Sequence, residues 1–233
     1  MLRAIGQRLS YNRSMSSVHV QKVAEADFPS RWGKFRILGF TGSRTDSRPE
    51  PGCEDSSTRK AVEDMVVLVM GDVTGDPPLV RIHSQCLTGD VFGSLRCDCR
   101  PQLEMALRMI AEAGRGILVY EQQEGRGIGL IPKLQAYALQ DSGLDTVEAN
   151  EELGFKADCR DFDLAAAVLR QMGVTQVRLI TSNPEKIAAL EAAGIQVTER
   201  VAAAVAPEAT FERYLEVKRE KLGHLDDSPA RQK

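Results

Sequence analysis

The chain has 233 residues, a formal net charge of −3 and only 5% aromatic residues. This length allows one large domain or two small ones, with a core built mainly from aliphatic side chains. The charge gives no general basic field, so we expect no nucleic-acid partner. No uninterrupted apolar run reaches about 18 residues, so we expect no membrane span.

The cysteines occur in an odd number, five, and no secretory signal peptide precedes them. We therefore expect a reduced, cytoplasmic protein rather than a disulfide scaffold. Residues 1–16 carry three arginines, several serines and no acid, as a transit peptide does. Because so short a segment carries little information, we favour a disordered extension at 1–17, or a start at Met15.

Residues 41–60 are rich in Ser, Arg, Pro, Gly and acidic residues, which predicts a surface loop inserted in the domain. Cys53 lies in this loop, and we do not expect it to bind a metal. The polar residues 226–233 predict a flexible tail.

Strands alternate with helices along the rest of the chain. Apolar runs predict strands at 65–70, 79–83, 117–120, 177–180 and 195–201. Periodicity and capping residues predict helices at 101–114, 130–140, 162–172, 184–193 and 211–222. In the second of these helices, Leu130, Leu134, Tyr137 and Ala138 share one face. The alternation predicts a layered α/β domain.

Three of the cysteines, Cys86, Cys97 and Cys99, fall within fourteen residues. Thiolates are good zinc ligands, and three protein ligands leave the fourth tetrahedral position open for water. A zinc-bound water can ionise near neutral pH and attack carbon, so the spacing favours a catalytic zinc site. Three other interpretations stay open: buried apolar cysteines, a disulfide, and a structural zinc site completed by His83.

A glycine-rich loop, EGRGIG at 124–129, follows the strand predicted at 117–120 and leads into a helix. Its glycines let backbone amides approach an anion, although an ordinary strand-to-helix turn explains them as well. The spacing fits neither a dinucleotide-binding motif nor a P-loop. Glu124 can accept hydrogen bonds from a guanine edge, and Arg126 can clamp a phosphate.

Two other segments lie directly before predicted helices. In TSNPEK, at 181–186, helix capping explains the first residues, but the helix dipole disfavours a cation such as Lys186 there. A bound phosphate would remove that conflict. In DCRD, at 158–161, capping and a surface ion pair are the simple explanation.

Taken together, several motifs resemble the GTP cyclohydrolase II family. They are RIHSQCLTGD (81–90), SLRCDC (94–99), QEGRGIGL (123–130), YALQD (137–141), DTVEAN (145–150) and LGFKAD (153–158). The match keeps one register from residue 18 to residue 225, which is far more specific than any single motif. The resemblance implies one catalytic domain over 18–225, with a mixed β-sheet layered with helices, and a homodimer.

The family begins riboflavin biosynthesis. It uses GTP and water to form 2,5-diamino-6-ribosylamino-4(3H)-pyrimidinone 5′-phosphate, formate and pyrophosphate. The resemblance implies one Zn²⁺ per chain and Mg²⁺ bound with the triphosphate. No stretch matches the ketone-phosphate-forming synthase often fused to this family, so we expect a single activity.

The resemblance also assigns roles to residues. Asp158 would accept a proton, Arg160 would attack the α-phosphorus, and Tyr137 would assist the ring chemistry. Zinc would be held by Cys86, Cys97 and Cys99. Contacts with GTP are implied for Arg81, Ile82, His83, Ser84, Gln85, Gln102, Glu124, Gly125, Arg126, Thr146, Thr181 and Lys186.

Alternatives to these roles stay open. A guanidinium is protonated in proteins and is a poor nucleophile, so Arg160 would then only stabilise charge while water attacks phosphorus. Cys159, with a thiolate stabilised by Arg160, is a further candidate nucleophile. Departures from the family pattern are Gln85, Gln122 and Ser182, where Glu, Arg and Asn are usual.

Two other functions also stay open. One is a related enzyme that opens the ring and stops at the formamidopyrimidine. The other is a non-catalytic nucleotide-binding zinc module. The resemblance associates Tyr137 with full turnover, so we favour the complete reaction.

Overall fold

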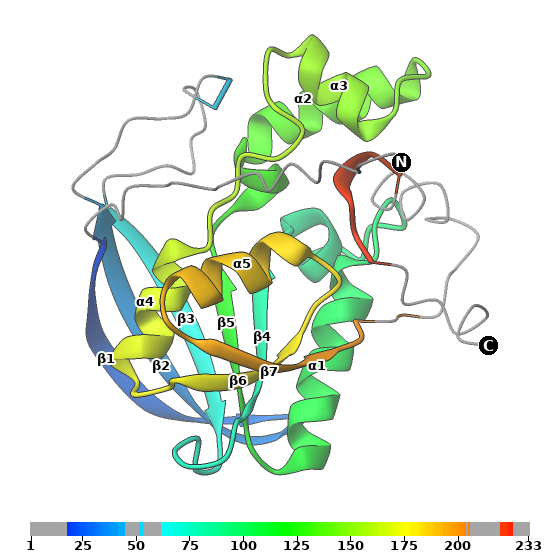
Figure 1. The fold of residues 1–233 in the computed structure, drawn as a ribbon. Helices are drawn as coiled ribbons and strands as arrows, with labels where there is room; N and C mark the ends of the chain where they lie inside the picture. The colour runs from blue at the N-terminus through cyan, green and yellow to red at the C-terminus, as the bar shows by residue number, and fades with distance from the viewer. Residues whose placement is uncertain (1–17, 45–51, 54–61, 204, 206–219, 226–233) are drawn as a thin grey trace, which may run out of the picture.

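The computed structural model describes residues 18–44, 52–53, 62–203, 205 and 220–225 (Figure 1). Within these residues, seven strands form one sheet in the order β1-β2-β3-β5-β4-β6-β7, so the α/β class is confirmed. The extension at 1–17, the tail at 226–233 and most of the helix expected at 211–222 lie outside the described residues. No helix in the described part of the chain is both long and apolar enough to cross a membrane.

The elements run in the following order. The strands are β1 (Val18–Ser30), β2 (Gly33–Arg44), β3 (Val62–Met70), β4 (Leu79–Ser84), β5 (Gly116–Glu121), β6 (Gln176–Ile180) and β7 (Gln196–Val201). The helices are α1 (Cys99–Ala113), α2 (Leu130–Asp141), α3 (Thr146–Glu152), α4 (Asp163–Gln171) and α5 (Pro184–Ala192). Two single turns are η1 (Leu87–Val91) and η2 (Glu124–Gly127).

The long hairpin of β1 and β2 was not expected from the sequence. It joins the sheet through antiparallel pairing of β2 with β3. The loop expected from residue 41 is wrong at its start, because Thr41 pairs with Asp64 of β3 and β2 continues to Arg44. Residues 41–44 are too polar for their composition to predict a strand, but pairing with β3 stabilises one there.

Helices cover both faces of the parallel half of the sheet (Figure 1). On β4, Val80 and Ile82 belong to the core shared with α4 and α5, whereas Leu79 belongs to the core shared with α1. Such alternation follows from the two-residue period of a strand. The connection from β4 to β5 therefore runs over the face that α1 covers. The connection from β5 to β6 runs over the opposite face, which α4 covers.

That change of face occurs between β4 and β5, which are parallel neighbours. In open α/β sheets, ligands bind in the crevice outside the carboxyl ends of strands at such a point. The cysteine segment follows β4, the glycine-rich loop follows β5, and the 181–186 segment follows β6. The topology thus gathers three distant sequence segments at one edge.

Helices α2 and α3 project beyond this edge (Figure 1). The apolar face expected for α2 is wrong: Leu134 is 44% exposed, Ala138 is exposed, and Ala136 is the buried residue. The helix turns Ala136 and Tyr137 toward a pocket instead. Side-chain type predicts the hydrophobic stripe of a helix packed on a core, whereas this helix packs mainly against α3 and lines the pocket.

Candidate functional site

The three clustered cysteines converge. Cys86 lies two residues after the end of β4, η1 reverses the chain, and Cys99 begins α1. The sulfur atoms of Cys86, Cys97 and Cys99 all lie within 4.8 Å of one another, with 3.7 Å between those of Cys86 and Cys97. Zinc–sulfur bonds of about 2.3 Å in a tetrahedron place the sulfurs about 3.8 Å apart. The donor set therefore fits one zinc ion.

Two of the alternatives for this cluster, a disulfide and a structural zinc site completed by His83, are not supported. All three thiols are free of disulfides, and no His, Asp or Glu among the described residues joins the group. His83 instead places Nε2 at 3.1 and 3.2 Å from the two carboxylate oxygens of Asp90. Asp90 also accepts hydrogen bonds from the Tyr120 hydroxyl, at 2.8 Å, and the Cys86 amide, at 3.1 Å. His83 thus helps to hold the cysteine loop in place through its contact with Asp90.

Gly89 of η1 packs under the cluster. A Cβ at this position would lie 2.9 Å from the Cys97 sulfur and 3.1 Å from the Cys86 sulfur. We expect Gly89→Ala to weaken zinc binding about tenfold or more, because the thiols must move apart. Competition with a chelator measures this affinity.

Gly39→Ala provides a matched control, since its Cβ would meet only ordinary contacts, the nearest at 3.5 Å. Equal zinc affinity for the Gly89 variant and the control would contradict the expected ligand geometry.

A pocket of about 660 Å³, including its open mouth, lies beside the thiols. The residues expected at the site that line it are Ser84, Gln85, Cys86, Cys97, Cys99, Glu124, Gly125, Arg126, Tyr137, Thr146 and Arg160. The expected residues outside this lining are Arg81, Ile82, His83, Gln102, Asp158, Thr181 and Lys186.

The glycine-rich loop forms one wall of the pocket. Arg126 has a φ of 59° and is the one non-glycine with positive φ in the described part of the chain. A Cβ on Gly127 would lie 2.7 Å from the backbone carbon of Cys159. Only glycine permits this approach, which presses the loop against the 158–161 segment. Backbone strain of the kind seen at Arg126 is typical of functional sites.

Glu124 is already engaged in this structure. Its Oε1 accepts hydrogen bonds from the Lys133 ammonium at 2.6 Å and the Gly125 amide at 3.0 Å, and its Oε2 accepts one from the Leu87 amide at 2.6 Å. A carboxylate has about four acceptor positions, so one remains free on Oε2. Accepting two hydrogen bonds from a guanine edge therefore requires Lys133 to turn away.

Lys133 was not identified from the sequence. Its ammonium also lies 3.1 Å from the Cys86 sulfur and 5.7 Å from the centroid of the Tyr137 ring. Its position four residues before Tyr137 on α2 is the sequence signal that could have shown it. Lys133 therefore links the thiol cluster to the helix that carries Tyr137.

Tyr137 points its hydroxyl to the Thr88 hydroxyl, 3.1 Å away. The Arg96 guanidinium lies 4.8 Å from the ring centroid. Burial raises the pKa of Tyr137 above its usual value. The phenol is therefore protonated at neutral pH and can donate a hydrogen bond or a proton.

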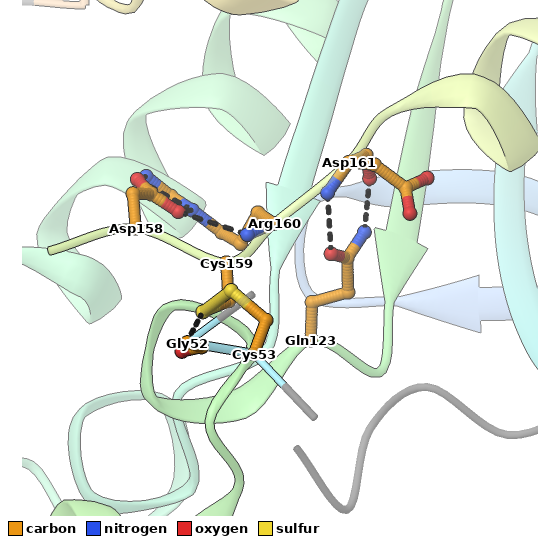
Figure 2. The surroundings of a disulfide bond; sticks show 7 residues. All are labelled: Gly52, Cys53, Gln123, Asp158, Cys159, Arg160 and Asp161. Carbon is orange, nitrogen blue, oxygen red and sulfur yellow. Dashed lines mark hydrogen bonds and ion pairs between the residues drawn. A yellow bond between two sulfur atoms is a disulfide. The ribbon is translucent and has the colours of Figure 1, made fainter. Parts of the chain in front are cut away.

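Asp158 and Arg160 form a close ion pair (Figure 2). The Arg160 Nε lies 2.9 and 3.1 Å from the two carboxylate oxygens, Nη2 donates as well, and the Arg160 amide donates at 3.0 Å. Burial acts to raise the pKa of Asp158, but the Arg160 charge and hydrogen bonds outweigh it and keep this pKa lowered. Both groups are therefore charged at neutral pH.

Further cations lie behind the pocket. Arg81 donates to the Ile180 carbonyl at 3.0 Å and to the Gln102 side chain. Lys186 donates to the Ile82 carbonyl at 2.8 Å, so Ile82 contributes through its backbone. Burial lowers the pKa of Arg81 to about 10 and that of Lys186 well below its usual value. An anion in the pocket would favour their charged forms.

Glu121, at the end of β5, is a buried acid that the sequence did not single out. Its side chain is 1% exposed, and neither oxygen has a hydrogen-bond partner. Burial raises its pKa from 4.5 to about 8; Asp161 and Glu63 act in the same direction, against Lys186 and Arg160.

We expect Glu121→Gln to stabilise the protein at alkaline pH. The folded state holds the proton between pH 4.5 and 8 while the unfolded state releases it, so wild-type stability falls across this window. The variant lacks that loss, which amounts to as much as about 5 kcal/mol above pH 8. Urea unfolding at pH 5 and pH 9 measures the difference. A variant less stable than wild type at pH 9 would show instead that the carboxylate is charged and paired with Lys186.

Cys53 and Cys159 are joined by a disulfide across 106 residues of sequence (Figure 2). This corrects the expectation of a fully reduced protein, and it overturns Cys159 as a nucleophile because its thiol is not free. The Cys53 side chain is buried, at 2% exposed. Spacing along the chain does not reveal pairs so far apart.

The fold and the site define an α/β protein with three convergent thiols that could hold a metal ion, beside a pocket with several cations, at the carboxyl edge of the sheet. The family model described as GTP cyclohydrolase II matches residues 21–202. GTP cyclohydrolase-2 of Escherichia coli (strain HS) is 51% identical over 209 residues, covering 89% of this chain and 98% of that protein. The chain therefore belongs to the GTP cyclohydrolase II family, as its motifs predicted.

Longer relatives exist as well. Riboflavin biosynthesis protein RibBA of Chlorobium phaeovibrioides is 51% identical over 207 residues, covering 88% of this chain. The chain spans about half of that protein, 47%. Among solved structures, RibBX of A. baumannii, a two-domain 3,4-dihydroxy-2-butanone 4-phosphate synthase, has 16% identity and a TM-score of 0.37, covering 84% of this chain and 41% of that one. That likeness is too weak to bear on function.

Proposed function

We propose that the protein is a zinc-dependent GTP cyclohydrolase II, which converts GTP to the diaminopyrimidinone ribosyl phosphate, formate and pyrophosphate at the start of riboflavin biosynthesis. One observation carries the proposal: three convergent thiols and the cations Arg126 and Arg160 face one pocket in a member of this family. A purine at the thiols and a triphosphate at the cations would fill it.

At the purine end, Cys86, Cys97 and Cys99 would hold zinc. When bound, zinc would supply an activated water near neutral pH for attack on the purine ring. Glu124 has one acceptor position left for the guanine edge, and Lys133 would move aside to free a second. Tyr137, protonated by burial, would donate a proton during the ring steps.

At the phosphate end, Arg126 and Arg160 would neutralise charge, with Mg²⁺ bound to the triphosphate. Lys186 and Arg81, both buried behind the pocket, would add positive charge to this field. Because Arg160 is held in a charged pair with Asp158, we favour water as the nucleophile toward phosphorus. Asp158 would then orient Arg160 and receive a proton late in the reaction.

A homodimer is part of the proposal. Several large apolar side chains near the pocket are exposed, at 44–73% of their area: Val91, Phe92, Leu95, Ile131 and Leu134. Contiguous exposed apolar surface is typical of interaction sites. A second copy of this chain, as the family resemblance implies, would cover them.

Tyr137→Phe separates the complete reaction from one that stops after ring opening. With GTP, zinc and Mg²⁺, we expect wild type to give the diaminopyrimidine monophosphate and formate in a mass spectrum. The variant, lacking the proton donor, should accumulate a product heavier by one CO. Wild type that accumulates this formylated product itself would favour the related ring-opening enzyme. GTP left unchanged by zinc-loaded wild type would overturn the proposed function.

A further inference from the structure

We propose that the Cys53–Cys159 disulfide positions the Asp158–Arg160 pair, which makes Cys53 and Cys159 positioning residues of the pocket. The inference rests on the proposed function, because that function gives Arg160 its role at the phosphate. It adds a covalent restraint that directly adjoins both charged groups.

The disulfide enters the chain between the two functional residues. Cys159 separates Asp158 from Arg160, and the Cα atoms of Cys53 and Cys159 lie 5.8 Å apart. Figure 2 shows the Cys159 side chain reaching toward Cys53, while the side chains of Asp158 and Arg160 meet on the other side of the backbone. The bond therefore restrains the backbone on the side away from the ion pair and leaves Arg160 lining the pocket.

No helix or strand restrains this stretch, which lies between α3 and α4. Its later part is held by polar contacts at Asp161. The Asp161 amide donates to the Gln123 side chain at 3.0 Å, the Gln123 amide group donates back to the Asp161 carbonyl, and Arg44 donates to the Asp161 carboxylate at 2.7 Å. Asp161 is thus fixed to the sheet and to the loop after β5.

The earlier part is held by backbone hydrogen bonds to two other segments. The Cys159 amide donates to the Arg126 carbonyl at 2.9 Å, and the Lys156 amide donates to the Gly52 carbonyl at 3.0 Å. The second of these bonds depends on the segment that carries Cys53. Breaking the disulfide would remove the covalent link between that segment and Cys159.

The disulfide also packs behind the pocket wall. Cys53 and Cys159, 2% and 7% exposed, form a small apolar cluster with Ile128, and Phe155 packs against it. Ile128 lines the pocket beside Arg126 and Arg160. Loss of the disulfide would therefore alter the pocket wall beside Arg126 and Arg160.

The bond itself is tested first. Iodoacetamide added to the unfolded protein without reductant should modify three cysteines, and five after treatment with tris(2-carboxyethyl)phosphine. The phosphine gives two electrons to the sulfur–sulfur bond, each sulfur gains a proton, and oxygen from water converts the phosphine to its oxide. Five modified cysteines without reductant would overturn the proposal.

The positioning role is tested with Cys53→Ala, Cys159→Ala and the double variant, all loaded with zinc. We expect kcat for GTP to fall about tenfold in each, with a much smaller change in KM, because a misplaced charge weakens transition-state contacts. The double variant should match either single one. Reductant should lower wild-type kcat to the same level and leave the variants unchanged. A merely structural role would lower the unfolding temperature and keep kcat at the wild-type value.

Hydrogen–deuterium exchange of residues 155–162 provides a readout without turnover, and it uses reduced wild type if a variant fails to fold. We expect faster exchange there after reduction, with no change at residues 86–99. If reduction speeds exchange in this segment but oxidised wild type leaves GTP unchanged, the proposed function fails and the restraint on the segment stands. Unchanged exchange and unchanged kcat would overturn the inference.

Discussion

Cys97→Ser is expected to abolish zinc binding and to lower GTP consumption by about a thousandfold or more. The Cys97 sulfur lies 3.7 Å from that of Cys86 and would contribute one of the three proposed zinc ligands. A serine hydroxyl binds zinc poorly at neutral pH, and two thiols are too few to retain the ion. Metal analysis by mass spectrometry and a GTP-consumption assay measure the two effects together.

Cys53→Ala is the matched control for zinc content, because Cys53 belongs to the disulfide and not to the cluster. We expect it to retain one zinc ion per chain. Full GTP turnover by a zinc-free Cys97→Ser protein would contradict the proposed metal chemistry.

Arg160→Lys is expected to lower kcat by about a hundredfold or more. Arg160 meets both oxygens of Asp158 with a planar fork, whereas a lysine keeps the charge on one ammonium without this geometry. The Asp158 carboxylate would lose its paired contacts inside a buried site. Steady-state kinetics with GTP measure kcat and KM separately.

The matched control is Arg170→Lys, at an exposed position near the end of α4. It should leave kcat unchanged. A substitution at Arg160 that changes only KM would show that its contacts form equally in the bound substrate and the transition state.

Much of the sheet could be predicted from sequence, because its central strands are buried. The runs at 65–70, 79–83 and 117–120 coincide with β3, β4 and β5 to within three residues at each end. Gly114, with a φ of 67°, ends α1 as its type predicts. The β1–β2 hairpin was missed because its outer strand is largely exposed and is stabilised by pairing.

At the site, the sequence predicted residues that carry their own chemistry, such as the three cysteines. It did not predict partners brought in by the fold. Lys133 reaches Cys86 across 47 residues, and Cys53 reaches Cys159 across 106. These contacts depend on packing between distant segments, which no local spacing encodes. The deep placement of Lys186 and Arg81 likewise follows from the sheet rather than from their motifs.

The most direct test follows the carbon that the reaction expels. GTP labelled with ¹³C at C8 would be incubated with the zinc-loaded protein and Mg²⁺ and monitored by NMR. The account predicts one equivalent of ¹³C-formate for each GTP consumed, and none with Cys97→Ser. Labelled carbon that stays in an intact guanine ring while GTP is consumed would contradict it.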